Sequence, residues 1–233
     1  MIDAIICHPR DVLFPWFMRS MKRNRDKFGQ VIIIMTQSAT SINFSNYITA
    51  EIPGVTLIES YKDDGKDWRN AAIHEALKYS TGDHILFLEQ DFLYENSFLP
   101  RILTSTANTI GFYEGKRLHP AFLLVKKDIL DQSSKDFSVE KDVGDHFSKL
   151  TKELEKIGGI QQLDGTDWCH IAGLTQNYRL TENWYSPQIF YQYNHLSQAL
   201  PQHQLWVQLS KQKEQEMGII SPHPSINLEK YFL

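Results

Sequence analysis

The sequence predicts a single α/β domain in which a mostly parallel sheet has helices on both faces. Short, mainly apolar runs at 2–7, 31–35 and 85–88 are typical of strands that are buried on both faces. Segments with helical apolar spacing lie between these runs, so parallel pairing of the strands is expected. The length of 233 residues suits one such domain better than two.

The first half of this domain is predicted as strand, helix, strand. After the strand at 2–7, a loop leads into a helix over 15–28, which Gly29 is expected to end. Basic side chains form one face of that helix and fit a solvated surface, with peripheral contact to anionic lipid or an anionic acceptor as the alternative. They are Arg19, Lys22, Arg23, Arg25 and Lys27.

Further elements follow in order. A strand at 55–58 precedes a charged loop and a helix with Trp68, Ala72, Ala76 and Tyr79 on one face. Thr81-Gly82-Asp83 breaks the chain before the strand at 85–88. A short helix ending at 103, strands at 110–113 and 121–125, and a helix over 147–157 complete the expected core.

Two carboxylates, Glu89 and Asp91, directly follow the buried strand at 85–88. In open α/β sheets, ligands bind beyond the carboxyl ends of the strands. Carboxylate oxygens suit a divalent cation, Mn²⁺ or Mg²⁺, that keeps several waters and also takes phosphate oxygens. The pair is therefore a candidate metal site, and polar turn residues at the end of a strand are the alternative interpretation.

Arg69 lies in the first turn of the helix before this strand, where the helix dipole disfavours a cation. A guanidinium there can pair with the acids at the strand end or with a diphosphate, since both match its fork of donors. An exposed arginine at a helix end is the alternative.

Between Gly65 and Asp91 the order of motifs resembles the nucleotide-sugar glycosyltransferases of the GT-A fold, family 2 type. Their pattern is a Gly, an Arg-Asn pair opening a helix, a Gly-Asp, an apolar strand and a DxD motif. Here it reads Gly65, Arg69-Asn70, Gly82-Asp83, the strand at 85–88 and Glu89-Gln90-Asp91. Glu89 departs from the usual first Asp of that motif.

The resemblance extends over about 2–195 and implies a Rossmann-like GT-A domain at 1–196 with a mixed, mostly parallel central sheet. The remaining 197–233 is expected to form a C-terminal helix and tail packed on that domain. It also implies a nucleotide-sugar donor such as a UDP- or GDP-sugar, a glycan or glycoconjugate acceptor, and a nucleotide site that includes Arg69 and Asn70.

Further site residues follow from the resemblance by their order along the chain. The loop after the first strand contacts the nucleotide base in such enzymes, which points to His8, Pro9 and Arg10, although an ordinary strand-to-helix connection explains them equally. Family members frequently have a third metal ligand near the end of the domain, which points to His195. An imidazole ligand suits Mn²⁺ better than Mg²⁺, and a surface histidine is the simpler interpretation.

In inverting members a carboxylate at the start of a helix takes the acceptor proton, which points to Asp145 or Asp142 before the helix at 147–157. An Asp in that place also fits a helix cap. His119 is expected on the acceptor side, with a structural histidine as the alternative. Trp168 and Trp184 offer planar apolar faces for a sugar, although core packing is the commoner role of such residues.

Composition limits the function classes. The net charge of −4 and the pI near 6.1 give no positive field for nucleic acid. Cys7 and Cys169 form neither a zinc motif nor a disulfide framework, so we expect reduced thiols in a cytoplasmic protein. No apolar run approaches the ~20 residues of a membrane span, so membrane contact is expected to be peripheral at most.

The sequence thus predicts a metal-dependent glycosyltransferase that acts on an acceptor hydroxyl, with inversion expected. Two alternatives remain. A sugar-phosphate nucleotidyltransferase has a related sheet but usually a Gly-rich loop with a basic residue after the first strand, which this chain lacks. A catalytically silent nucleotide- or sugar-binding module would lack a base near the metal. A Rossmann-type dehydrogenase is disfavoured because no G-x-G-x-x-G follows a strand.

Overall fold

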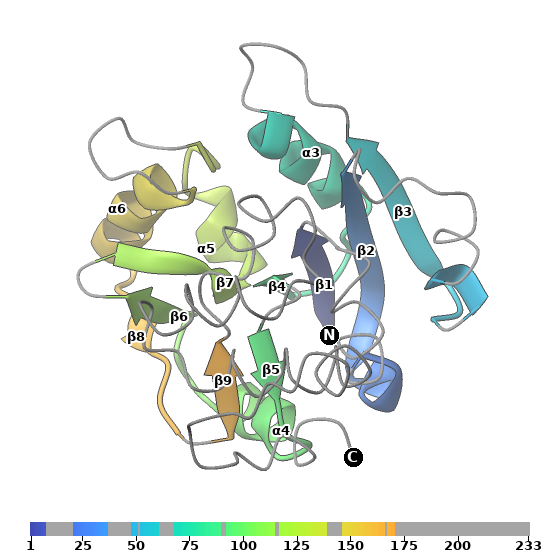
Figure 1. Cartoon of the computed structure of the whole chain (residues 1–233). Helices are drawn as coiled ribbons and strands as arrows, with labels where there is room; N and C mark the ends of the chain where they lie inside the picture. The colour runs from blue at the N-terminus through green and yellow to red at the C-terminus, as the bar shows by residue number, and fades with distance from the viewer. Residues whose placement is uncertain are drawn as a thin grey trace, which may run out of the picture.

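The computed structural model describes residues 1–7, 21–36, 48–50, 52–60, 68–89, 92–114, 117–138, 146–165 and 167–170. Within these ranges, seven strands form one sheet in the order β3-β2-β1-β4-β7-β6-β8 (Figure 1). They are β1 (Ile2–Cys7), β2 (Phe28–Thr36), β3 (Val55–Ser60), β4 (His84–Glu89), β6 (Thr109–Glu114), β7 (Arg117–Lys126) and β8 (Gln161–Gln162).

Strands β1 to β4 are parallel, whereas β7 is antiparallel to both β4 and β6. β1 is central to the parallel part, and Cys7 at its end is in register with Ile34 of β2 and Glu89 of β4. The carboxyl ends of these strands therefore meet at one edge, and Glu89 lies on it. The expected mixed, mostly parallel α/β sheet is confirmed.

Two apolar layers cover the faces of the sheet. On one face lie α3 (Trp68–Leu77), α5 (Lys127–Asp131) and α6 (Ser148–Ile157), packed on a core that includes Ile5 and Phe87. On the other lie α4 (Phe98–Leu103) and the two-stranded sheet of β5 (Phe92–Tyr94) and β9 (Trp168–His170). In Figure 1, β5, β9 and α4 form one group, apart from α3, α5 and α6.

The helix predicted over 15–28 ends earlier than expected. Residues 21–23 are helical, Arg25–Lys27 form a 3-10 turn (η1), and β2 already begins at Phe28. Phe28 is buried in the core, and a Cβ on Gly29 would lie 2.7 Å from Asp3 Oδ1. Gly29 is therefore needed where β2 passes close to β1, not to end a helix.

Arg25, which was predicted to lie on a basic helix face, contacts the backbone of neighbouring segments. Its Nη1 donates to the Phe28 carbonyl at 2.7 Å and its Nε donates to the Pro53 carbonyl at 3.3 Å. Arg25 thus ties the turn after the first helix to the loop before β3, and this part of the expected basic face has a structural role.

Asp3 joins three segments at the amino edge of the sheet. Its side chain is fully buried, and four donors reach the carboxylate. They are the backbone nitrogen of Gln30 at 2.7 Å, the hydroxyl of Ser80 at 2.8 Å, and the backbone nitrogens of Thr81 and Gly82 at 2.6 Å each. A buried charge is tolerated here because hydrogen bonds replace its water. This edge lies opposite the one that carries Glu89.

The expected boundary at 196 and the C-terminal segment at 197–233 lie outside the described residues. Among the helices that the structure describes, none combines the length and apolarity needed to cross a membrane.

Candidate active site

Two of the residues expected in the site, Arg69 and Glu89, meet at the carboxyl edge of the sheet. Glu89 ends β4, and Arg69 lies in the first turn of α3. Side chains alternate along a strand, so Glu89 is on the same face as Phe87, which packs on the α3 side. Arg69 Nη1 lies 3.6 Å from Glu89 Oε1, and each side chain is 17% exposed. The result is a half-buried ion pair at the strand end.

Cys7 lies beside this ion pair, in register with Glu89. Burial raises the pKa of its thiol to about 12; the nearby Arg69 guanidinium lowers it and Glu89 raises it, both to a smaller extent. The thiol is therefore neutral near pH 7, and a neutral thiol is a poor nucleophile and a poor metal ligand. Cys7 acts as a small apolar residue beneath the pair.

The guanidinium of Arg69 is only partly satisfied. Its Nε is buried and has no hydrogen-bond partner among the residues described. Buried donors nearly always find an acceptor, and leaving one unpaired costs about 1–3 kcal/mol. The Nε–H of the Arg69 guanidinium is therefore available to an acceptor other than the described residues.

Asn70 ties α3 to the loop that precedes α6. Its Oδ1 accepts a hydrogen bond from the Phe137 backbone nitrogen at 3.0 Å. The Phe137 ring is fully buried and packs 5.5 Å from Phe87 and 5.3 Å from Phe147, centroid to centroid. The backbone nitrogen of Phe147 in turn donates to the Phe137 carbonyl at 3.2 Å. Both ends of the segment between Phe137 and Phe147 are thus fixed beside Asn70.

That segment contains the two candidate bases, Asp142 and Asp145, which lie outside the described residues. The helix that follows, α6, has Phe147 at its N-cap position in a left-handed conformation with φ 67°.

The two described residues expected on the acceptor side, His119 and Trp168, belong to one aromatic cluster. Phe112 links them, with ring centroids 5.4 Å from His119 and 5.1 Å from Trp168. Phe92 stacks on Trp168 at 5.3 Å and 14°. His119 Nδ1 accepts a hydrogen bond from the backbone nitrogen of Ala121 at 3.1 Å, which orients its ring.

This aromatic cluster and the Arg69–Glu89 pair lie on opposite faces of the sheet. Phe92, Phe112 and Trp168 pack on the core below α4, whereas Cys7 and Phe87 pack on the core below α3. The expected site residues that the structure describes thus form two groups, one on each face of the sheet.

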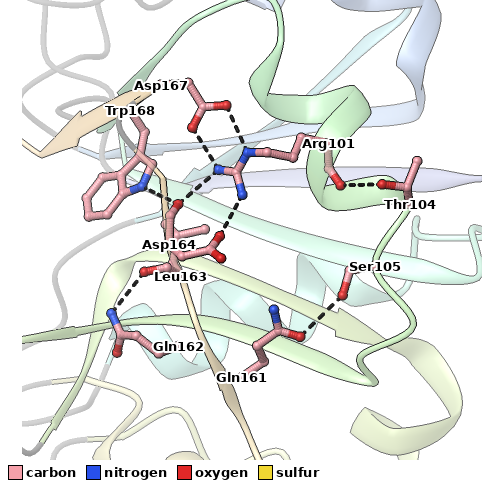
Figure 2. A network of polar contacts seen from close by, with 9 residues as sticks. All are labelled: Arg101, Thr104, Ser105, Gln161, Gln162, Leu163, Asp164, Asp167 and Trp168. Atoms are coloured by element: carbon pink, nitrogen blue, oxygen red, sulfur yellow. Dashed lines mark hydrogen bonds and ion pairs between the residues drawn. The ribbon is translucent and has the colours of Figure 1, made fainter.

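A network around Arg101 holds Trp168 in place (Figure 2). Arg101, on α4, donates to Asp167 through Nε at 3.0 Å and Nη2 at 2.7 Å, a bidentate pair. It also donates to the Asp164 carboxylate at 2.7 Å and to the Asp164 carbonyl at 2.9 Å. That carbonyl accepts the indole N–H of Trp168 at 2.9 Å. These bonds hold Asp164 and Asp167 against α4, and Asp164 in turn holds the Trp168 indole.

Gly165 permits the tight turn in this network. Its φ is +92°, and a Cβ there would lie 2.7 Å from Arg101 Nη2. No strand was predicted at 168–170, where β9 forms. Asp-Gly at 164–165 signals a turn, but nothing local signals that Arg101, 63 residues away from Asp164, is the partner.

The other expected site residues lie outside the described part of the chain: His8, Pro9, Arg10, Asp91, Trp184 and His195. Within the described part, no group of three or more His, Cys, Asp or Glu side chains could hold a metal ion. Glu89 alone of the three expected ligands is described. Its carboxylate fits a hard cation that takes its remaining ligands from water and phosphate, with the Arg69 guanidinium as its present counter-ion.

A pocket of about 530 Å³ lies at the opposite, amino end of β4, lined in part by His84, Lys126 and Asp128. Several of its charged groups already have partners: Asp83 binds the Met1 ammonium at 2.7 Å, and Lys127 donates to the Ser80 carbonyl at 3.0 Å. This pocket is separate from the Arg69–Glu89 pair.

Solved structures with a similar fold include two glycosyltransferases. One is a mannosyltransferase from Pyrobaculum calidifontis in complex with GDP-Man and Mn²⁺, with 14% identity, a TM-score of 0.54, and 96% of this chain and 76% of that one covered. Another is glucosyl-3-phosphoglycerate synthase from Mycobacterium tuberculosis in complex with Mn²⁺, UDP-glucose and glycerol 3-phosphate, with 13% identity, a TM-score of 0.51, and 73% and 72% covered.

A Bacillus anthracis protein assigned as a glucose-1-phosphate thymidylyltransferase, in complex with sucrose, is also similar, with 10% identity, a TM-score of 0.50, and 78% and 96% covered. No protein-family model and no curated protein sequence matches the chain. At these identities the likeness concerns the fold, and the chain has the GT-A fold.

Proposed function

We propose that this protein is a metal-dependent glycosyltransferase that transfers a sugar from a nucleotide-diphosphate sugar to an acceptor hydroxyl. The observation that carries the proposal is the ion pair between Arg69 and Glu89 at the carboxyl end of β4. In a GT-A sheet this is the edge where ligands bind. At that edge a guanidinium can bind a diphosphate, and a carboxylate can bind the cation that accompanies it.

In this proposal Glu89 and Asp91, with His195 as a third ligand, would hold Mn²⁺ or Mg²⁺ against the diphosphate. Such a cation supplies Lewis-acid stabilisation of the charge on the departing nucleotide. Arg69 binds and orients the same diphosphate through its unpaired donor. His8, Pro9, Arg10 and Asn70 complete the proposed donor site.

Asp145, or Asp142, takes the proton of the acceptor hydroxyl as the new bond to the anomeric carbon forms, with inversion of configuration. The anchoring of Phe137 and Phe147 supports this assignment, because the segment that bears both acids starts at Phe137, which bonds to Asn70, and ends at Phe147, which bonds to Phe137. His119, Trp168 and Trp184 are proposed to contact the acceptor. For Trp168, support comes from its partial exposure and its fixed orientation on Phe92.

A sugar-phosphate nucleotidyltransferase is the second candidate, since one of the similar folds is assigned to such an enzyme. The two reactions release different products. A glycosyltransferase incubated with UDP-glucose or GDP-mannose and Mn²⁺ releases the nucleoside diphosphate, whereas a nucleotidyltransferase incubated with a nucleoside triphosphate and a sugar 1-phosphate releases pyrophosphate.

Thermal unfolding in the presence of nucleoside diphosphates tests the proposed function. With Mn²⁺, UDP or GDP at 100-fold excess over Kd should raise the Tm by roughly 5 °C or more, because the ligand binds only the native state. EDTA should abolish the shift. Asp91→Asn should lose both the shift and the release of nucleoside diphosphate from a donor sugar, while its far-UV circular dichroism stays unchanged.

Glu75→Gln is the matched control, since it neutralises an exposed acid on α3 that pairs with Lys78 away from the site. It should respond as the parent does. The proposed function would be contradicted if the Tm of the parent did not change with any nucleoside diphosphate in the presence of Mn²⁺. It would also be contradicted if Asp91→Asn turned over at the parental rate.

A further inference from the structure

The ion pair between Arg69 and Glu89 is close but loosely bonded. The distance of 3.6 Å from Nη1 to Oε1 satisfies an ion pair, yet it exceeds the roughly 2.7–3.2 Å of an N–H···O hydrogen bond. Both side chains are only 17% exposed, so solvent screens their attraction weakly. Charge, more than a directional bond, holds the guanidinium at this carboxylate.

Arg69 also has unused bonding capacity. Its Nε is buried without a partner among the described residues, although a guanidinium can bind two oxygens of one phosphate or carboxylate at once. Its position in the first turn of α3 is unfavourable for a cation because of the helix dipole. An anion with two free oxygens would offer this side chain a better partner than Glu89 does.

We propose that the Arg69 guanidinium occupies the cation's place at Glu89 until a nucleoside diphosphate draws it away. This inference rests on the proposed function. A guanidinium and a divalent cation repel each other when both lie against one carboxylate. The diphosphate removes this repulsion, since it gives Arg69 a bidentate partner and draws the guanidinium away from the Glu89 carboxylate. Cation and nucleotide therefore raise each other's affinity, and by thermodynamic linkage they do so by the same factor.

Arg69→Gln tests the proposal with Mn²⁺ alone. Free Mn²⁺ is measured by its EPR signal in titrations without nucleotide and then with UDP or GDP. Without nucleotide, the variant should bind Mn²⁺ about five- to tenfold more tightly than the parent, because the competing charge is gone. On addition of nucleotide, the gain in Mn²⁺ affinity should be smaller in the variant than in the parent.

Two further variants locate the effect. Lys78→Gln removes one positive charge from a 69% exposed side chain just beyond α3, and it should bind Mn²⁺ as the parent does. The double variant Arg69→Gln/Glu89→Gln should lose the gain seen in Arg69→Gln, because the Glu89 carboxylate is the source of that gain. A double variant that keeps the full gain would overturn the role of Glu89.

Thermal unfolding gives a second measurement on the same proteins. Mn²⁺ alone should raise the Tm of Arg69→Gln more than that of the parent. If Arg69→Gln does not fold, Arg69→Lys keeps the charge and should bind Mn²⁺ alone within about twofold of the parent. A tightening of tenfold in that lysine variant would overturn the proposal.

The failure of this inference differs from the failure of the proposed function. If Arg69→Gln binds Mn²⁺ alone no more tightly than the parent while UDP or GDP still promotes Mn²⁺ binding in both, the exchange at Glu89 is wrong and the proposed function stands. If neither protein binds Mn²⁺ at millimolar concentration with or without nucleotide, the proposed function fails, and the inference fails with it.

Discussion

Single carboxylates in this protein have different roles because their surroundings differ. Glu89 pairs with the Arg69 guanidinium at the site, Asp3 is buried and accepts hydrogen bonds from four donors, and Asp136 lies at the surface of the loop before α6. All three are acidic residues, so the residue type alone does not separate a candidate ligand from a structural anchor.

Asp136 provides a pH test at the residue scale. The pKa of Asp136 is lowered from 3.8 to about 2, chiefly by the Ser138 hydroxyl and also by Lys149, whose Nζ lies 2.9 Å away. A depressed folded-state pKa stabilises the protein above the unfolded pKa, and this contribution is lost as the pH falls through the folded value. The difference in unfolding free energy between the parent and Asp136→Asn should therefore be constant above pH 5 and shrink between about pH 4 and pH 2.

Urea denaturation at several pH values measures this difference, and the m-values of the two proteins should agree. A difference that remains constant down to pH 2.5 would show that Asp136 does not contribute through its charge.

At the scale of elements, the protein depends on contacts that join short segments. α4 has six residues and β9 has three, and neither is long enough to be stable by itself. Arg101 joins them through Asp164 and Asp167 (Figure 2). Phe92, on β5, stacks on the ring of Trp168. The orientation of Trp168, one of the expected acceptor residues, therefore depends on a charged residue that belongs to another element.

Two matched substitutions test this dependence. Asp167 is 15% exposed and accepts the bidentate pair from Arg101, so Asp167→Asn should cost about 1–3 kcal/mol of unfolding free energy. Asp164 is 73% exposed, so Asp164→Asn should cost about 0.5 kcal/mol or less. Chemical denaturation of both variants gives the comparison, and near-UV circular dichroism reports the aromatic packing. Equal losses in the two variants would contradict the assigned roles.

At the scale of the whole molecule, one edge of the sheet carries the candidate site and the opposite edge has a structural role. The carboxyl edge carries the Arg69–Glu89 pair of the candidate site, and the amino edge is closed by Asp3. Because Asp3 bonds to β2 and to the turn before β4, it ties together the three central strands on which the site is built.

Asp3→Asn should destabilise the entire fold by about 2–4 kcal/mol, because one oxygen that accepts buried N–H groups becomes a donor. Asp83→Asn makes the same chemical change at the same edge on a side chain that is 80% exposed, and little change is expected. The midpoint of urea unfolding measures both. An Asp3→Asn protein as stable as the parent would show that its four donors find other partners.

Much of the fold follows from local sequence patterns. The apolar runs predicted β1, β2 and β4, and the spacing of apolar residues predicted α3 and α6 with nearly correct bounds. The helix end near Gly29 was wrong, because the burial of Phe28 and the approach of β1 favour a strand there. The strand β9 was missed because three residues carry too little periodicity to show pairing with β5.

The sequence by itself determined the apolar strands, the helices between them and the acid at the end of β4, because each depends on neighbouring residues and on the periods of strand and helix. Only the tertiary structure decided that Arg69 meets Glu89, that Arg101 binds Asp164 and Asp167, that β7 is antiparallel to β4, and that the aromatic cluster and the ion pair lie on opposite faces. These outcomes depend on how distant segments cross, and local periodicity contains no information about which charge faces which partner.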